Sequence, residues 1–221
     1  MRVSGSSTLS TGKVDEEVIT TGSTKINGDF ECEGFKSSGS LKGSGNLTVN
    51  GDFRCAGSFR LNGSVNIKGD ARSSGTTNID GELQINGYYS KSGSLKIRKQ
   101  VKATKGVKIS GSTSIKGNLI SEKDVEIYGS TTIDGNIKAD NVYIGMPVDN
   151  LRPWQPYKIY GNIIADNAVI IKKTFVGGDI EGWSVKIENG CHVEGTVYYV
   201  NSIEVNPRVK LANKPVQIKD K

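Results

Sequence analysis

A six-residue unit, Leu47-Thr48-Val49-Asn50-Gly51-Asp52, decides the fold of this chain because it recurs along much of its length. Its two apolar residues occupy alternate positions, which predicts a short β-strand, since successive strand side chains point to opposite faces. The glycine and the short polar residue that follow are typical of a turn. Glycine accepts a positive φ, and Asp or Asn side chains bond the nearby backbone. Each hexad therefore predicts one very short strand and one corner.

Glycine keeps the period of six over most of the chain. The glycines in this register are Gly39, Gly45, Gly51, Gly57, Gly63, Gly69, Gly75, Gly81, Gly87, Gly93, Gly111, Gly117, Gly129 and Gly135. A helical interpretation fails, because glycine inside a helix costs roughly 1 kcal/mol per site relative to alanine.

A longer period decides how the strands are arranged. Large aliphatic residues recur at a spacing of 18 in two series. The first is Leu61, Ile79, Ile97, Ile115 and Ile133, and the second is Leu47, Val65, Leu83, Val101, Leu119 and Ile137. Three hexads per repeat describe a coil with three faces, in which like residues stack on like residues in neighbouring coils. The sequence therefore predicts an all-β fold, a triangular β-helix (solenoid) with three short strands in each 18-residue coil.

The same pattern divides the chain into one domain and two tails. Residues 1–13 are rich in Ser, Thr and Gly without periodicity, which predicts a flexible N-terminal tail. Residues 14–212 form a single predicted β-helix domain, and residues 213–221 form a polar C-terminal tail. Within the domain, residues 145–158 contain three prolines and no alternation, so we expect an inserted loop there.

Two aromatic residues of that loop, Trp154 and Tyr157, have two interpretations. In the first interpretation they form a recognition tip, because aromatic residues on loops often mark binding sites. In the second they fold back and cover one flank of the solenoid. The sequence leaves both interpretations open.

Basic residues recur on outward positions. The formal net charge is +6. One outward ladder carries Lys36, Arg54, Arg72 and Lys108, and a second carries Lys42, Arg60 and Lys96. A basic face of this kind could hold a polyanion. We favour the alternative, that outward charges keep the solenoid soluble and discourage lateral pairing, since acidic residues are interspersed at neighbouring corners. Nucleic acid is therefore not an expected partner.

Residues that could carry out chemistry are scarce. His192 is the only histidine, which excludes a zinc site with three histidine ligands. The three cysteines, Cys32, Cys55 and Cys191, match no zinc-binding spacing and lie at inward hexad positions, where they act as small core residues. There is no P-loop and no acidic cluster. We expect no catalytic residue, metal or cofactor, no nucleotide and no enzymatic activity.

The targeting signals of membrane and secreted proteins are also missing. No apolar run is long enough to span a bilayer. The residues that follow Met1 lack the hydrophobic segment of a signal peptide. We therefore expect a cytoplasmic protein.

The later repeats carry a more specific signature. Residues 178–195 contain a Gly-Asp-Ile, then an Ile-Glu-Asn-Gly, then a Val-Glu-Gly, and residues 133–139 and 159–165 contain Gly-x-Ile-x-Ala units. In this order the motifs resemble the bactofilin family, most closely over residues 100–205. The chain is longer than one typical bactofilin core, which the resemblance interprets as an extended or duplicated form.

The resemblance implies a right-handed β-helix and a cytoskeletal role. Bactofilins polymerise end to end without nucleotide into filaments that are often membrane-associated and act as scaffolds. It implies that the main partner is another copy of this chain, with a membrane surface or cell-envelope proteins as further partners. The expected function is a non-catalytic scaffold. The alternative is a β-helical binding module that uses the basic face or the Trp154 loop.

The ends of the solenoid are where such a polymer would form. A β-helix has no lateral edges, but both ends expose unpaired backbone and an open apolar core, so each end is either capped or stacked on another copy. The expected polymer interface is formed at the N-terminal end by Val14, Val18 and Ile19, and at the C-terminal end by Tyr199, Ile203, Val205, Val209 and Leu211.

Overall fold

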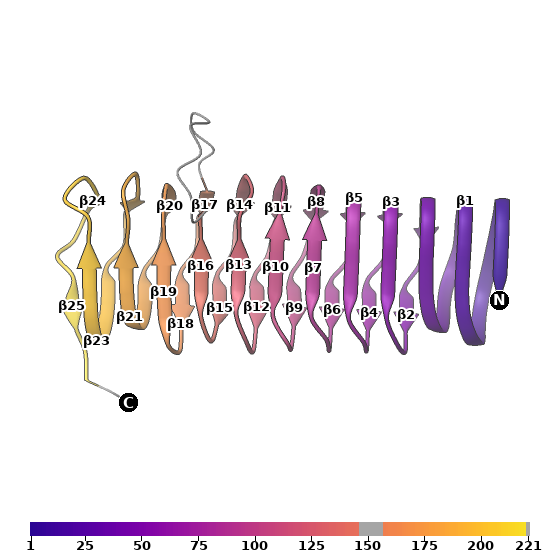
Figure 1. Ribbon diagram of the computed structural model, residues 1–221, viewed down its shortest axis with the longest axis horizontal. Helices are drawn as coiled ribbons and strands as arrows, with labels where there is room; N and C mark the ends of the chain where they lie inside the picture. Colours follow the sequence, from indigo (N-terminus) through magenta and orange to yellow (C-terminus); the bar gives the residue numbers. More distant parts are fainter. Residues whose placement is uncertain (146–156, 220–221) are drawn as a thin grey trace.

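The computed structural model of the chain describes residues 1–145 and 157–219, and in this part it contains 25 β-strands and no helix. The strands wind into one straight rod with the two termini at opposite ends (Figure 1). Each coil pairs with the next in parallel register, as Leu47 with Val65 and Val65 with Leu83. The fold is a right-handed β-solenoid of about 10 turns, which confirms the predicted fold class.

The strands form three parallel sheets, called here faces 1, 2 and 3. β1 (Arg2–Ser44) winds through the first coils and contributes to all three. Face 1 continues with β2 (Leu47–Val49), β4 (Val65–Ile67), β6 (Leu83–Ile85), β9 (Val101–Ala103), β12 (Leu119–Ser121), β15 (Ile137–Ala139), β18 (Ile163–Ala165), the start of β21 (Ile180–Ile187) and of β23 (Val197–Val205), and β25 (Val216–Gln217).

Faces 2 and 3 continue in the same way. Face 2 contains the start of β3 (Phe53–Leu61) and of β5 (Ala71–Ile79), then β7 (Tyr89–Ser92), β10 (Val107–Ser110), β13 (Val125–Ile127), β16 (Val142–Ile144), β19 (Ala168–Ile171) and the ends of β21 and β23. Face 3 contains the ends of β3 and β5, then β8 (Ser94–Ile97), β11 (Thr113–Ile115), β14 (Thr131–Ile133), β17 (Tyr157–Ile159), β20 (Thr174–Val176), β22 (His192–Val193) and β24 (Lys210–Leu211).

The core is a set of stacked aliphatic ladders. Ile79, Ile97, Ile115 and Ile133 follow one another in register and are at most 1% exposed. The second predicted series, from Leu47 to Ile137, is buried in the same way on face 1. The period of 18 therefore gave the correct register for the middle of the chain.

Glycine makes the corner between faces 2 and 3. At Gly39, Gly57 and Gly75 the φ angles are 119°, 127° and 88°, a region that other residues rarely adopt. A Cβ on Gly57 would lie 2.2 Å from the carbonyl oxygen of Gly39 in the preceding coil. Glycine is therefore required here, and it lets β3 and β5 run through the corner without interruption.

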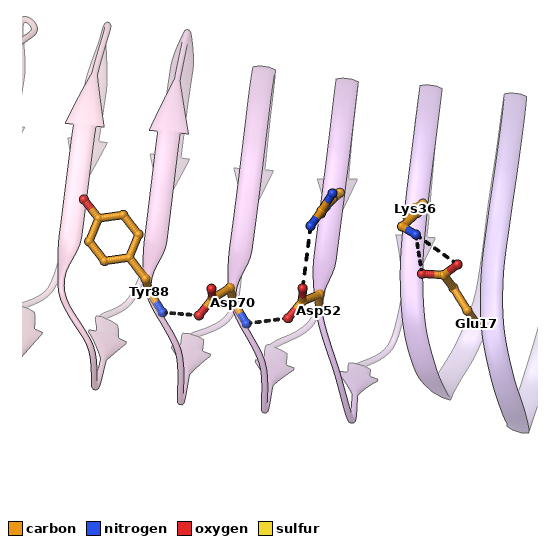
Figure 2. A network of polar contacts seen from close by, with 6 residues as sticks. Glu17, Lys36, Asp52, Asp70 and Tyr88 are labelled. Atoms are coloured by element: carbon orange, nitrogen blue, oxygen red, sulfur yellow. Dashed lines mark hydrogen bonds and ion pairs between the residues drawn. The ribbon is translucent and has the colours of Figure 1, made fainter.

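Side-chain oxygens bind the backbone of the next coil at the other corners. Figure 2 shows one such series, in which the amide of Asp70 donates to Oδ1 of Asp52 (3.0 Å) and the amide of Tyr88 donates to Oδ1 of Asp70 (2.9 Å). A longer series runs through Asn118, Asn136, Asn162, Asp179 and Thr196. The polar residues of the hexads thus link successive coils as well as forming turns.

The predicted N-terminal tail is wrong. Residues 2–13 belong to β1 and form a further coil, because Ser7 Oγ lies 3.2 Å from Thr24 Oγ1 and the amide of Ile19 donates to the Met1 carbonyl (2.9 Å). The periodicity is hard to detect because small polar residues such as Ser7 take inward places that are aliphatic elsewhere.

The predicted C-terminal tail also contains structure. β25 pairs with β23, Val216 opposite Tyr198 and Gln217 opposite Tyr199, so this segment adds a final strand to face 1. Of the predicted inserted loop, residues 146–156 lie outside the described residues. Tyr157, at its end, is the first residue of β17.

Candidate interaction surfaces at the ends and along one side

The C-terminal end presents an open cross-section of the core. Ile203 and Val205 of β23 and Leu211 of β24 are the last inward residues on faces 2 and 3. These side chains and Val209 are only partly buried and pack against the core from one side. No described strand pairs beyond them, so this end offers aliphatic side chains together with unpaired backbone groups.

Tyr199 differs from these residues in its backbone. β25 pairs with it, and the amide of Ile218 donates to the Tyr199 carbonyl (2.9 Å). Its side chain is partly buried like those of the other predicted end residues, so its place in a polymer interface stays a prediction. The sequence analysis missed the partner strand because residues beyond 212 were assigned to a tail.

The N-terminal end is displaced by one coil from its predicted place. Val14 is partly buried and packs against the core beside Val3, as a terminal residue would. Val18 is completely buried, and Ile19 lies on the side of the rod, where it lines a hollow with Lys36. The assignment of Val18 and Ile19 to the end is wrong, because residues 1–13 form the true first coil.

The basic ladder on face 2 has the predicted geometry. Lys36, Arg54 and Arg72 stand opposite one another on successive coils, and Ser90 and Lys108 continue the row. Lys36 forms an ion pair with Glu17 (2.8 Å), which Figure 2 shows beside the corner carboxylates. Lys108 bonds Glu126 (2.9 Å), whose hydrogen bond and charge raise the pKa of Lys108.

Arg54 and Arg72 are less engaged. Arg54 Nη2 lies 3.8 Å from Asp52 Oδ2, and both side chains are about half exposed. Arg72 has no ion pair or hydrogen bond in the part of the chain that the structure describes. A hollow of about 400 Å³ lies beside this row and is lined by Lys36, Arg54, Arg72 and small residues that include Ser38 and Ser74.

Lys91 is a residue that the sequence analysis missed. It occupies an inward position two residues after the core residue Tyr89, and only 1% of it is exposed. Its Nζ donates to the carbonyls of Gly75 and Ser92, both at 2.8 Å, and lies 3.4 Å from Ser73 Oγ. Burial lowers the pKa of Lys91 to about 8. The inward phase of its hexad was the signal that could have identified it.

The thiols and the histidine are poorly suited to catalysis. Burial raises the pKa of Cys32 to about 12 and those of Cys55 and Cys191 to about 11, so the nucleophilic thiolate is scarce. His192 is exposed on face 3, with its ring 5.7 Å from that of Phe175. Among residues 1–145 and 157–219, no three His, Cys, Asp or Glu side chains gather as metal ligands would.

The two aromatic residues of the predicted recognition loop differ in their outcome. Trp154 lies outside the described residues. Tyr157 is 5% exposed and packs in the core of face 3, so its assignment to a recognition tip is wrong. Its burial follows from its place as the first inward residue of β17.

Comparison with known proteins bears on the C-terminal part of the rod. The model of the bactofilin family, described as polymer-forming and cytoskeletal, matches residues 92–212, more than half of the chain. The chain belongs to the bactofilin family. The bactofilin match includes the open C-terminal end, whereas the first coils of this bactofilin lie outside it. No curated protein and no solved structure matches the chain.

Residues 1–91 nevertheless continue the same solenoid as the matched part. β8 pairs in register with β5, and β10 pairs in register with β7, so the core passes between the two parts without a break. This bactofilin is therefore an extended form of the matched domain. Within the described parts of the chain, no helix is long and apolar enough to cross a bilayer.

Proposed function

We propose that this bactofilin is a non-catalytic cytoskeletal scaffold that assembles end to end into filaments without nucleotide. The observation that supports the proposal most directly is the open C-terminal end, where Ile203, Val205, Val209 and Leu211 are only half covered. The family description as polymer-forming agrees with it.

Stacking another copy on this end would remove apolar surface from water and satisfy free backbone groups. Full burial of a large aliphatic side chain contributes about 1.5–3 kcal/mol, of which these residues have gained only a part within one copy. The outer edges of β23 and β24 also carry unpaired amides and carbonyls, which template the addition of a strand. A second rod would supply both the apolar contact and the backbone hydrogen-bond partners.

The N-terminal end would provide the other contact. Val3 and Val14 lie there against the core, and the first coil carries many small hydroxyl residues. The two ends therefore differ in chemistry. Contacts between like ends would give a filament without polarity, and contacts between unlike ends would give a polar one.

The experiment compares Val205→Glu with Asn201→Glu by negative-stain electron microscopy and analytical ultracentrifugation at low and high salt without nucleotide. Both variants add one negative charge to β23, but Val205 faces the open core and Asn201 is exposed on the side of the rod. We expect filaments from the wild type and from Asn201→Glu, and short soluble species from Val205→Glu. Unchanged filaments from Val205→Glu would show that the end is not the interface.

The mass of the soluble species reports the polarity of the filament. If like ends meet, Val205→Glu leaves dimers joined at the N-terminal end, and Val14→Glu leaves dimers joined at the C-terminal end. If unlike ends meet, each variant alone leaves monomers. Circular dichroism of each variant must match that of the wild type, so that loss of assembly is separated from loss of folding.

We also propose that the scaffold works in the cytoplasm, with its side available to a membrane surface or to cell-envelope proteins. The cytoskeletal description of the family supports the location, and the three free cysteines are suited to a compartment that keeps thiols reduced. Cell fractionation tests the proposed cytoplasmic location. Recovery of the native protein only outside the cytoplasmic membrane would contradict the proposal.

A further inference from the structure

One corner of the rod carries seven successive segments without a single acidic residue. The segments are residues 2–8, 19–25, 36–42, 54–60, 72–78, 90–96 and 108–114. They stack on one another at the corner between faces 2 and 3, in register from Lys36 onward. We call this surface the serine strip, because small hydroxyl residues and glycine fill its centre.

The serine strip holds more than the net positive charge of the whole chain. Its cations are Arg2, Lys25, Lys36, Lys42, Arg54, Arg60, Arg72, Lys91, Lys96 and Lys108. The chain has a net charge of +6, so these 10 cations leave −4 for the rest of the chain, which holds all 23 acidic residues. The net positive charge of the chain thus comes from one side of the N-terminal half.

Two rows of long cationic side chains flank the centre of the strip. The first row contains Lys36, Arg54 and Arg72, and the second contains Lys42, Arg60 and Lys96. Between them lie short segments such as Ser38-Gly39-Ser40 and Ser74-Gly75-Thr76. The hollow of about 400 Å³ runs along the axis between the first row and these small residues. Successive rungs are about 4.8 Å apart.

The stacking of like charges in the strip has an energetic cost. Lys36, Arg54 and Arg72 stand directly opposite one another, and such pairs are destabilising. Lys42 and Arg60 stand opposite one another on the other side of the corner. Several outward neighbours elsewhere have opposite charges, as in Lys116 with Asp134 (2.8 Å) and Lys186 with Glu204 (3.0 Å). Two rows of like charge on one surface without acidic residues do nothing for folding, so they point to a bound anion.

Four cations of the strip are available to such an anion. Lys42, Arg60, Arg72 and Lys96 are exposed, and none has an acidic partner among residues 1–145 and 157–219. Lys91 lies beneath the strip, where its amine is held by the carbonyls of Gly75 and Ser92. The positive charge of these four residues is therefore not compensated by an ion pair, unlike that of Lys36 and Arg54.

The composition of the strip defines the class of ligand. From Lys36 onward its large apolar residues, including Leu41, Phe59 and Leu95, are buried, and Ile19 adds one partly exposed aliphatic side chain to the hollow. The centre therefore offers no ring on which a base could stack and too little apolar surface for an acyl chain. Arginine forks and hydroxyl groups match phosphate oxygens. We propose that the serine strip binds a linear chain of phosphate groups without bases, either inorganic polyphosphate or a polyol-phosphate polymer.

The test measures the affinity of the full-length protein for long-chain inorganic polyphosphate between 50 and 200 mM salt. Four neutralised phosphates predict that the logarithm of the binding constant falls with that of the salt concentration with a slope of about −3. The variant Arg60→Glu/Arg72→Glu changes two exposed residues that carry no contact. We expect it to lose at least about tenfold in affinity and to show a shallower slope.

The control variant is Lys138→Glu/Lys158→Glu, which makes the same change in net charge on exposed positions of faces 1 and 3. We expect its affinity to stay close to that of the wild type. An equal loss in both variants would show that only net charge matters and would overturn the proposal.

Further titrations with other phosphate-containing ligands identify the source of the phosphate. Tighter binding of inorganic polyphosphate or of poly(glycerol phosphate) assigns the ligand to one of these two sources. Equal or tighter binding of single-stranded DNA with the same number of phosphates, or of vesicles that contain phosphatidylglycerol, would overturn the proposal. The strip lies on the side of the rod, so repeating the titration with Val205→Glu separates this result from the fate of the filament proposal.

Discussion

Lys91 is the residue that departs furthest from the rules of a β-solenoid core. Its place in the repeat is filled by Cys55, Ser73 and Ile109 in neighbouring coils. The long apolar stem can fill this space while the amine reaches two carbonyls near the corner. No carboxylate contacts it, so the native state holds a desolvated ammonium group at neutral pH.

This burial makes the stability of the protein depend on pH in a defined direction. The pKa of Lys91 is about 8 in the folded protein, against an ordinary lysine value of 10.5. Between these values the unfolded chain binds more protons than the native state, so the contribution of Lys91 to the free energy of unfolding rises with pH. The rise amounts to roughly 3 kcal/mol and is complete above the unfolded pKa.

We therefore predict that Lys91→Met is more stable than the wild type at pH 7 and that the difference shrinks as the pH rises to 10. Thermal unfolding of both proteins at one fixed concentration, in steps of one pH unit, measures it. Burial raises the pKa of the Cys55 thiol beside Lys91 to about 11 and the charge of Lys91 lowers it in part, so in Lys91→Met as well the folded thiol titrates above this range. A difference that stays constant across this range would mean that the amine keeps its ordinary pKa.

At the scale of the elements, corners hold the short strands in register. Strands of three residues have few backbone bonds of their own, and the corner side chains add bonds to the next coil. Asp70 does so twice over, because its amide donates to Asp52 and its carboxylate accepts from Tyr88. In the equivalent series Asn136 and Asn162 use an amide oxygen for the same purpose.

We predict that Asp70→Ala lowers the free energy of unfolding by about 1–2 kcal/mol, because the Tyr88 amide loses its acceptor. Asp70→Asn keeps an oxygen at the same place and should cost less than half as much. Urea denaturation followed by circular dichroism compares the two. Equal losses would assign the effect to the negative charge beside Arg72 instead of the corner bond.

The elements also show which parts of the structure a sequence can predict. Large aliphatic residues such as Leu47 and Ile133 recur at a fixed spacing, and that spacing alone gave the fold class and the register. The first coil was missed because Ser7 and other small polar residues take its inward positions, which weakens the periodicity on which the prediction depends. The ends of a solenoid lie where its pattern fades, so the end residues were the hardest to place.

The side of the rod was more predictable than its ends. The rows that contain Arg54 and Arg60 follow from the phase of the hexads, and the structure places them as expected. That the two rows border the same surface does not follow from the phase of either row alone. It depends on Gly57, whose positive φ turns the chain at the corner between them.

For the whole molecule, the repeat predicts that a complete turn can be removed. Deletion of residues 65–82 joins Ser64 to Leu83, which occupies the same place on face 1 as Val65. We expect the shortened protein to fold and its subunit repeat in filaments to shrink by about 4.8 Å. Deletion of residues 65–73 removes half a turn and should abolish folding. Circular dichroism and filament images check both, and a folded half-turn deletion would contradict the solenoid register.

The direction of the backbone hydrogen bonds has a mechanical consequence. They run along the axis of the rod, so a pulling force that is spread over its two ends loads the bonds of each interface between coils together, and the rod resists stretching until one interface opens. At the level of Ser73 and Lys91 the core contains hydroxyl groups and an amine in place of aliphatic side chains, so we expect that interface to open first. A polyphosphate chain bound across those coils from outside would reinforce the rod at the place where it is weakest under tension.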